Sequence, residues 1–189
     1  MMNRKRNRLK DFDYSSNNAY FITVCLHNRL KLFGEIVNEK MILSDSGKMI
    51  ERFWLVLQNK FPHVLLDEYV IMPDHIHGII MVFNDNYVGD DLCVVPKEKV
   101  SKHMGLKDKH TGLSLQKIIQ WFKTMTTNEY IKGVKKNLFV PFNKKLWQRS
   151  YYDRIIRSEE ELNKIREYIY FNPVKYGFER IDIENLNIP

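Results

Sequence analysis

Apolar positions along the chain follow two different periods, which predict strands and amphipathic helices. Ala19 to Leu26 is rich in β-branched and aromatic residues, as is typical of a strand. Residues 65–72 and 75–83 predict two further strands, joined by a hairpin-like connection at Pro73. Apolar side chains recur at helical spacing over residues 46–60 and predict an amphipathic helix, which the next proline ends.

The second half of the chain predicts two more helices, with irregular segments before each of them. Residues 84–112 are mostly polar and lack strong periodicity, so we expect an insertion there. Ser114 is placed to cap a helix that carries its apolar residues on one side. Residues 138–147 predict a short irregular or strand segment. Ser158 and Glu161 form a capping box that opens the last helix.

This order of elements predicts one α+β domain. A strand, a helix, two strands and two helices favour a sandwich with the helices on one face of an antiparallel sheet. We expect a basic arm over residues 1–18 and a C-terminal tail over residues 179–189. The domain between them spans residues 19–178, with residues 84–112 as its insertion.

The charge of the chain narrows the class of partner. Lys and Arg number 30 against 23 Asp and Glu, which gives a net charge of +7. Residues 1–10 hold five positive charges and residues 131–149 hold six, and neither segment contains an acid. Such clusters indicate a polyanion, most often a nucleic acid. On charge alone, a solvated surface with an unstructured arm explains them equally well.

Composition also sets the compartment that we expect. Hydrophobic residues make up 44% of the chain, which is typical of a globular protein with a core. No apolar run is long enough for a membrane helix, and the basic start lacks the apolar region of a secretory signal. Cys25 and Cys93 form no Cys-x-x-Cys pattern, which suits a reducing compartment. We therefore expect a soluble cytoplasmic protein that does not contact membranes.

Two histidines form the first candidate site. His75 and His77 flank Ile76 on a predicted strand, and residues two apart on a strand point to the same face. Two imidazoles would therefore project side by side, as two nitrogen ligands for one divalent metal ion. The pair alone is a weak signal, because two half-exposed histidines on a sheet give the same pattern.

A second candidate lies on the last predicted helix. Tyr168 and Asn172 are four residues apart and share a helical face, with Tyr168 at the border of the apolar stripe. A tyrosine in that position can reach a site on the sheet. A border tyrosine and an Asn-Pro helix end are also common without any function. Pro173 disfavours helical geometry at Asn172, so we expect the helix to end there.

Together these motifs resemble a known family, the REP-associated tyrosine transposases, a branch of the single-tyrosine HUH transposases. The most specific segments are Met72-Pro73-Asp74-His75-Ile76-His77 and the downstream Tyr168-Ile169-Tyr170-Phe171-Asn172-Pro173. The resemblance covers about residues 19 to 177 and includes these further segments: Tyr20-Phe21-Ile22-Thr23-Val24, Asn28-Arg29, Leu32-Phe33-Gly34-Glu35, Phe122-Lys123, Trp147-Gln148-Arg149-Ser150-Tyr151-Tyr152-Asp153 and Ile156-Arg157.

The resemblance implies a fold, a chemistry and a partner. The fold is a ferredoxin-like α+β sandwich with the histidine pair on a central strand. His75, His77 and Asn172 are implied as ligands of Mg²⁺ or Mn²⁺, and Tyr168 as the nucleophile. The family cuts single-stranded DNA beside imperfect palindromes that fold as hairpins, and it remains joined to the 5′ end through a phosphotyrosine. The resemblance leaves the oligomeric state open between a monomer and a homodimer.

The residues that would bind DNA are predicted less sharply than those that would cut it. Basic, polar and aromatic side chains suited to phosphate contact and base stacking are Arg4, Arg6, Lys123, Trp147, Gln148, Arg149 and Arg154. Tyr151, Tyr152 and Tyr170 are rival nucleophiles, but Tyr170 should face away from Tyr168 on the helix.

One residue departs from the family pattern. Many relatives have Asn where this chain has Asp74. We expect the change to affect the turn before His75, with added negative charge near the metal ion as the alternative. An active DNA transposase and an inactive DNA- or RNA-binding module on the same fold remain the two hypotheses. A small-substrate metal hydrolase is a third, and it leaves Tyr168 and the basic clusters without a role.

Overall fold

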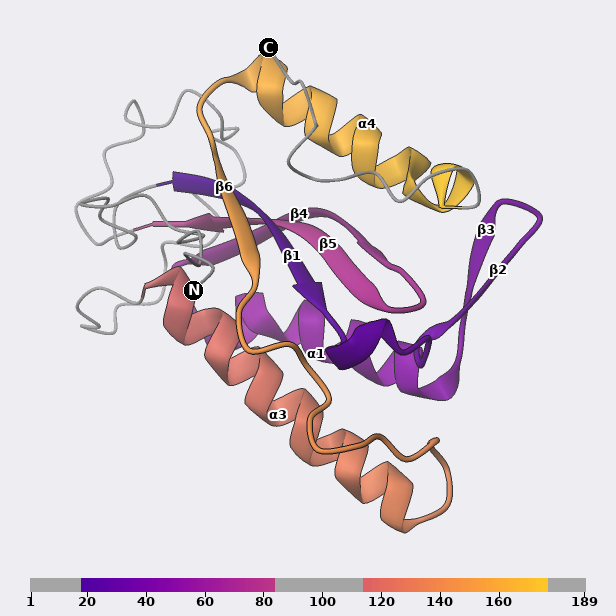
Figure 1. Cartoon of the computed structure of the whole chain (residues 1–189). Coiled ribbons are helices and arrows are strands. Elements are labelled where there is room, and N and C mark those ends of the chain that lie inside the picture. Colours follow the sequence, from indigo (N-terminus) through magenta and orange to yellow (C-terminus); the bar gives the residue numbers. More distant parts are fainter. Residues whose placement is uncertain (1–17, 84–113, 177–189) are drawn as a thin grey trace, which may run out of the picture.

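A four-stranded antiparallel sheet forms the centre of the computed structural model, which describes residues 18–83 and 114–176 (Figure 1). Its strands lie in the order β4-β5-β1-β6. Their bounds are Asn18–Cys25 for β1, Val64–Ile71 for β4, His75–Val82 for β5 and Tyr152–Ile156 for β6. Strands β1, β4 and β5 lie within one residue of the ranges predicted from the sequence. The basic arm with Arg4 and Arg6, the insertion with Cys93, and the tail over residues 179–189 lie outside the described residues.

Three helices accompany the sheet: α1 (Asp45–Lys60), α3 (Leu115–Lys135) and α4 (Glu159–Lys175). The Ser158 hydroxyl accepts a hydrogen bond from the Glu161 amide at 3.1 Å, which confirms half of the predicted capping box. Ser114 precedes α3 as predicted, but its side chain makes no capping hydrogen bond. No helix in the described ranges is long and apolar enough to cross a membrane.

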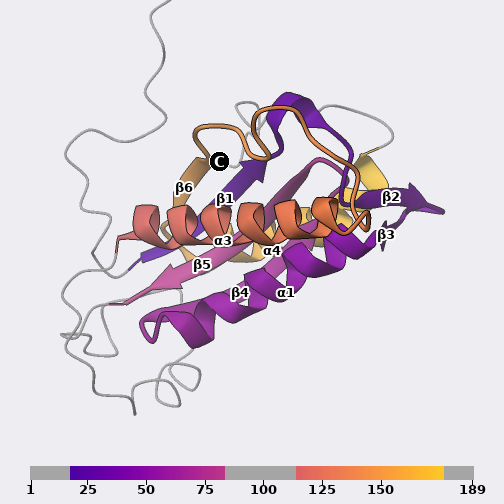
Figure 2. The ribbon, with the colours of Figure 1, turned by 90° about the horizontal axis from the view of Figure 1, so that it is seen from below.

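Alternation along β1 assigns the helices to the two faces of the sheet. Tyr20, Ile22 and Val24 pack in one apolar cluster with α1 and α3, whereas Ala19 and Phe21 pack in a second cluster with α4. Helices therefore cover both faces, and α4 lies on the side away from α1 and α3 (Figures 1 and 2). The α+β class with an antiparallel sheet is confirmed. The prediction that the helices share one face is wrong for α4, because its apolar stripe packs on the opposite face.

The order β1-α1-β4-β5-α3-β6 is that of a ferredoxin-like fold, in which α1 and α3 lie together on one face. A small hairpin of β2 (Gly34–Val37) and β3 (Lys40–Leu43) is inserted between β1 and α1. Its turn residues Asn38 and Glu39 both have positive φ, as a tight two-residue hairpin requires. The predicted irregular or strand segment after α3 contains only an isolated bridge between Leu26 and Trp147.

Helix α4 does not end where the sequence predicts. It continues through Pro173 to Lys175. Proline lacks only one amide donor, and the following turn is closed by the Tyr176 amide, which donates to the Asn172 carbonyl at 3.0 Å. Tyr168 and Asn172 consequently do share a helical face, and Tyr176 is brought to the same end of the helix.

Candidate active site

The two histidines lie at the beginning of β5, on the face of the sheet that α4 covers. His75 pairs with Cys25 and His77 with Thr23 on the neighbouring strand β1. Ile76 between them points into the core on the other face. Both histidines are buried, with 7% and 2% of their surface exposed. The prediction that their side chains share one face is confirmed, whereas half-exposed sheet histidines are excluded.

The two imidazole rings converge through their outer nitrogens. His75 Nε2 and His77 Nε2 are 3.0 Å apart. The inner nitrogens are both occupied: His77 Nδ1 is 2.8 Å from the Thr23 hydroxyl, and His75 Nδ1 is 2.6 Å from an oxygen of Asp74. When both Nδ1 atoms carry the proton, two lone pairs face each other across this short distance. In that tautomer, a cation between the rings can be bound by both lone pairs.

This donor set fits a metal ion of octahedral preference. Ligands on adjacent corners of an octahedron with 2.1 Å bonds lie roughly 3.0 Å apart, which is the separation of the two Nε2 atoms. The outer-shell partners of the rings are those that orient metal-binding histidines elsewhere. No cluster of three His, Cys, Asp or Glu ligands occurs among residues 18–83 and 114–176. A site here would combine the two imidazoles with an amide such as that of Asn172.

Tyr168 reaches the histidines from α4. Its hydroxyl lies 3.3 Å from His77 Nε2, and its ring packs edge-on against Phe21. Burial raises the pKa of the Tyr168 phenol, while a hydrogen bond with Asn172 and the positive charge of Arg29 act in the opposite direction. Burial also lowers the pKa of His77 well below its usual value, with a smaller contribution from His75. His77 is therefore neutral, as a metal ligand must be.

Asp74 joins the site to two residues that the sequence analysis did not single out. Its carboxylate accepts from Arg29 at 3.4 Å and from the Tyr176 hydroxyl at 3.5 Å, in addition to His75. Burial would raise the pKa of Asp74, but the hydrogen bond and charge of His75, together with Arg29, lower it below its usual value. The carboxylate therefore adds negative charge behind His75, rather than only shaping the turn.

Arg29 reaches this carboxylate from an unusual backbone. Asn28 and Arg29, in the short helix η1 (His27–Arg29), both have positive φ, which is uncommon for residues other than glycine. The side chain of Arg29 is 42% exposed, so its guanidinium lies between Asp74 and solvent. In the sequence, only the Asn28-Arg29 segment of the family resemblance pointed to Arg29 as a residue of the site.

The rival tyrosines lie elsewhere. Tyr170 is 75% exposed and points away from the histidines, as predicted. Tyr151 is buried in the cluster beneath α1 and α3. Tyr152 lies on β6 opposite Thr23, on the same face as the site, but no contact joins it to the histidines in the described residues. Of these tyrosines, only Tyr168 has its hydroxyl beside an imidazole.

The predicted DNA-binding residues divide into structural and exposed groups. Trp147 is buried, and its indole donates to Thr126 at 3.0 Å between α3 and the β-sheet, so its ring has no free face for a base. Lys123 donates to the backbone carbonyls of Gln148 and Arg149. Both residues hold the segment after α3 in place, and their assignment to DNA contact stays a prediction.

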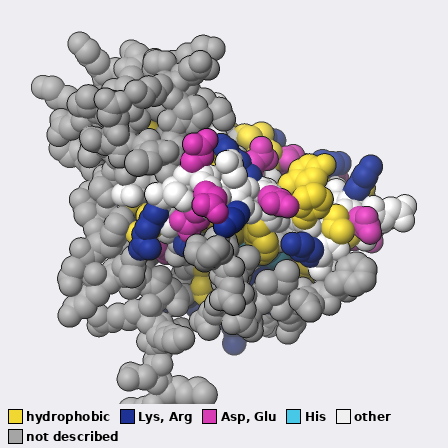
Figure 3. Space-filling model, turned by 90° about the horizontal axis from the view of Figure 1, so that it is seen from above, with side chains coloured by type: hydrophobic (Ala, Val, Ile, Leu, Met, Phe, Trp, Pro, Cys, Tyr) yellow, Lys and Arg dark blue, Asp and Glu magenta, His cyan; other side chains and the backbone are white. Residues whose placement is uncertain are grey.

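The remaining candidates are closer to solvent. Arg149 is exposed, Gln148 is half-buried, and Arg154 pairs with Glu161 at 2.8 Å. Over the described part of the α4 face, basic and acidic side chains are interspersed (Figure 3). That face therefore shows no continuous basic surface among its described residues.

Sequence comparison finds relatives of this chain among known proteins. No family model matches the chain. A Haemophilus influenzae protein named only "Uncharacterized protein" is 35% identical over 181 residues, covering 96% of this chain and 94% of its own length. A second protein of that organism, named "Putative REP-associated tyrosine transposase", is 25% identical over 176 residues, covering 88% of this chain and 76% of its own length.

A solved structure is also similar: "Structure of the REP associates tyrosine transposase bound to a REP hairpin". Its TM-score is 0.49 at 18% identity, covering 91% of this chain and 75% of that one. The first relative spans nearly the whole chain, and the second spans most of it. The chain is therefore similar over most of its length to a protein named as a putative REP-associated tyrosine transposase, and this likeness supports a transposase-like role.

Proposed function

We propose that this protein is a metal-dependent endonuclease and strand transferase that cuts single-stranded DNA beside hairpins. Tyr168 is its nucleophile, and the enzyme remains joined to the 5′ end of the DNA. One observation carries the proposal: in a buried site, His77 Nε2 lies 3.3 Å from the hydroxyl of Tyr168 and 3.0 Å from His75 Nε2. A nucleophile beside two free nitrogen ligands is what metal-assisted phosphoryl transfer needs.

The metal ion that we propose is Mg²⁺ or Mn²⁺, held by His75, His77 and the amide of Asn172. When bound, it supplies positive charge that polarises the scissile phosphate and orients it for attack. All three ligands are neutral, so they leave that charge available to an anionic substrate. Thr23 and Asp74 hold the two rings from behind, which fixes their direction.

The chemistry of the protein itself centres on Tyr168. Its hydroxyl oxygen forms a bond to phosphorus while the bond from phosphorus to the 3′ oxygen breaks. The phenol releases its proton to solvent and the departing 3′ oxygen takes one up, so the step consumes no net proton. The phosphodiester becomes a phosphotyrosine diester, so its energy is kept and rejoining needs no nucleotide triphosphate. Asn172 holds the phenol by a hydrogen bond, and the raised pKa of Tyr168 means that it is a phenol before the substrate binds.

A pair of tyrosines on the same helix gives a matched test. A labelled single-stranded hairpin is incubated with wild-type protein and Mg²⁺ or Mn²⁺, then analysed on a denaturing gel for a protein–DNA adduct. We expect the adduct with wild type and with Tyr170→Phe, and none with Tyr168→Phe. Both variants lose one hydroxyl from α4, but only one of these hydroxyls lies in the site.

The assay also separates the second hypothesis. If wild type binds hairpins but forms no adduct with either metal ion, the protein is a DNA- or RNA-binding module on the same fold. If Tyr168→Phe still forms the adduct, the assigned nucleophile is wrong.

A further inference from the structure

A loop that carries two cations lies over the turn that leads into β5. The loop is hydrogen-bonded to this turn at both of its ends. The Leu26 amide donates to the Asp74 carbonyl at 2.8 Å, and the Leu32 amide donates to the Pro73 carbonyl at 3.0 Å. The short helix η1 lies between these two attachments. Since the side chain of Asp74 also holds His75, the loop is fixed beside one edge of the candidate active site.

Arg29 and Lys31 are the cations of this loop, and both residues are exposed. Arg29 Nη1 donates to Asp74 at 3.4 Å. The ammonium group of Lys31 lies 5.7 Å from the centre of the Tyr176 ring, and that ring lies 6.4 Å from the ring of His75. The Tyr176 hydroxyl in turn contacts Asp74 at 3.5 Å. Both cations therefore lie on the side of the site that His75 occupies.

The contact between Arg29 and Asp74 differs from a structural ion pair of the same protein. Arg166 donates to Asp67 through two nitrogens, at 2.6 and 2.7 Å, and the Asp67 side chain is only 4% exposed. Arg29 donates to Asp74 through one nitrogen at 3.4 Å, and its other donors have no partner among residues 18–83 and 114–176. A guanidinium carries several N–H donors in a planar fork that matches the oxygens of a phosphate. Most of the fork of Arg29 is therefore available to a ligand.

The backbone of the loop is held in a conformation that costs energy. Asn28 and Arg29 have φ angles of 55° and 52°, in the left-handed region that residues other than glycine rarely adopt. Such residues persist where the surrounding structure imposes their conformation, and they cluster at active sites and ligand-binding sites. Both residues are exposed, so burial of their side chains does not account for the conformation. Its effect is to direct Arg29 onto the turn before β5.

The place of Arg29 also indicates which phosphate it would meet. The scissile phosphate that we propose lies beside the Tyr168 hydroxyl and His77 Nε2, whereas Arg29 approaches from behind Asp74. Burial is the main cause of the raised pKa of Tyr168 and of the lowered pKa of His77, and the charge of Arg29 lowers both. Arg29 is therefore close enough to act on the reacting groups by its charge, but it lies beside them. That is the place of a neighbouring phosphate.

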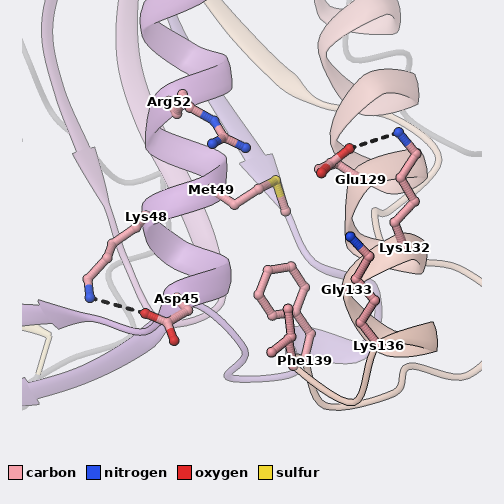
Figure 4. A pocket seen from close by; sticks show the side chains of 10 residues that line it. Asp45, Lys48, Met49, Arg52, Glu129, Lys132, Gly133, Lys136 and Phe139 are labelled. Carbon is pink, nitrogen blue, oxygen red and sulfur yellow. Dashed lines mark hydrogen bonds and ion pairs between the residues drawn. The ribbon is translucent and has the colours of Figure 1, made fainter.

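A group of cations elsewhere on the molecule is less suited to this strand. A hollow of about 430 Å³ between α1 and α3 is lined by several lysines (Figure 4). Two of them are already paired, Lys48 with Asp45 and Lys132 with Glu129, each at 3.1 Å. Helices α1 and α3 cover the face of the sheet opposite to Tyr168. The cations of the hollow therefore do not line the approach of a strand to Tyr168.

We propose that Arg29, with Lys31 beside it, binds the backbone phosphate next to the scissile phosphate of the DNA strand. The inference rests on the proposed function, because that strand is the substrate proposed above. Hydrogen bonds between a guanidinium and a phosphate are assisted by both charges and are stronger than neutral ones. The contact would fix the strand on the His75 side of the site, so that the scissile phosphate is held in line with the Tyr168 hydroxyl.

The test removes the two partners of this contact separately and together. Arg29→Gln removes the guanidinium, and Arg29→Lys keeps its charge. Arg157→Gln is the control, because it makes the same change at an exposed arginine after β6, at the opposite end of β1 from the histidines. The probes are DNA hairpins with a single-stranded flank, in which one phosphate at a time is replaced by an uncharged methylphosphonate. Binding is measured by fluorescence anisotropy in EDTA, which prevents metal-dependent cleavage.

We expect Arg29→Gln to reduce the slope of log affinity against log salt by about 0.7, the value for one phosphate contact with a single strand. Between about 1 M and about 0.15 M salt, this is roughly a fourfold loss of affinity. One methylphosphonate position should cost the wild type the same amount and cost Arg29→Gln nothing further, because the two changes remove the same contact. Arg29→Lys should keep the wild-type slope, and Arg157→Gln should behave as wild type throughout.

Two results would overturn the proposal. In the first, Arg29→Gln keeps the wild-type affinity for DNA in EDTA but binds Mn²⁺ more weakly in isothermal titration. Arg29 would then only support Asp74. In the second, Arg29→Gln stays sensitive to every methylphosphonate that weakens binding of the wild type, so that no single phosphate is its partner.

Failure of the proposed function is recognised separately. Sequencing of the covalent adduct formed on the unmodified hairpin locates the scissile phosphate, and the phosphate assigned to Arg29 should be its immediate neighbour. Any other position would contradict the assignment. An absent adduct with wild type would refute the nuclease, while the binding measurements in EDTA would still decide whether Arg29 contacts one phosphate of the strand.

Discussion

Replacing Asp74 with Asn changes one charge behind His75 and almost nothing in size. Asp74 accepts the short 2.6 Å hydrogen bond from His75 Nδ1, and its side chain is only 11% exposed. The carboxylate therefore strengthens His75 as a ligand and fixes the ring so that Nε2 points at His77. An asparagine oxygen can still accept from Nδ1, so the orientation remains while the charge is lost.

The magnitude follows from the kind of hydrogen bond that is replaced. A hydrogen bond to a charged group contributes about 1.5–3 kcal/mol and a neutral one about 0.5–1.5 kcal/mol. The midpoints of these ranges differ by about 1.3 kcal/mol, which is close to the tenfold change in an equilibrium constant that about 1.4 kcal/mol gives. We therefore expect Asp74→Asn to weaken Mn²⁺ binding about tenfold, at the lower end of the range for outer-shell substitutions.

Isothermal titration of metal-free protein with Mn²⁺ measures this without relying on activity. Asp45→Asn is the control, because it makes the same chemical change at an exposed carboxylate on α1. Wild type and Asp45→Asn should bind alike, with Asp74→Asn about tenfold weaker. Unchanged affinity in Asp74→Asn would refute the argument that this carboxylate supports a metal ligand.

Three further outcomes are expected. The free energy of unfolding of the metal-free protein should fall by up to about 1.4 kcal/mol per pH unit below about pH 6.5, because unfolded His77 gains a proton that the buried, folded imidazole does not. Urea unfolding in EDTA should show a smaller loss of stability in His77→Asn than in wild type. An identical pH profile in the two proteins would contradict the lowered pKa of His77. Trp147→Phe should destabilise the fold by about 1–3 kcal/mol, since it removes the hydrogen bond to Thr126, while hairpin affinity measured by anisotropy should stay at the wild-type value. A loss of affinity without a loss of stability would show that Trp147 contacts DNA. Gly78→Ala should cost about 1–3 kcal/mol in thermal or urea unfolding, because the added methyl group would lie 2.4 Å from the Trp54 ring; a neutral effect would show that this ring can move.

Local patterns were enough to predict the elements that hold the site. The β-branched and aromatic run of β1 and the apolar run of β5 predicted these strands to within one residue, and spacing alone placed His75 and His77 on one face. Strand β6 was missed because its five residues include Asp153 and Arg154, and only pairing with β1 makes them a strand.

The parts of the site that could not be predicted depend on contacts between distant segments. The rule that proline ends a helix failed at Pro173, where one lost hydrogen bond is outweighed by the packing of α4 on the sheet. Because the helix was predicted to end at Asn172, Tyr176 was not predicted as a residue near the site. Arg29 lies 45 residues from Asp74 in the sequence, and no periodicity connects a residue of η1 to the turn before β5.

The identity of the nucleophile is the central claim, and peptide mapping of the covalent adduct tests it most directly. After incubation of wild-type protein with a cognate hairpin and Mn²⁺, nuclease and trypsin leave a nucleotide on the peptide from Glu167 to Lys175, which contains both Tyr168 and Tyr170. Tandem mass spectrometry then assigns the phosphate to one tyrosine. The account predicts a phosphodiester on Tyr168; a phosphodiester on Tyr170, Tyr176 or any other residue would contradict it.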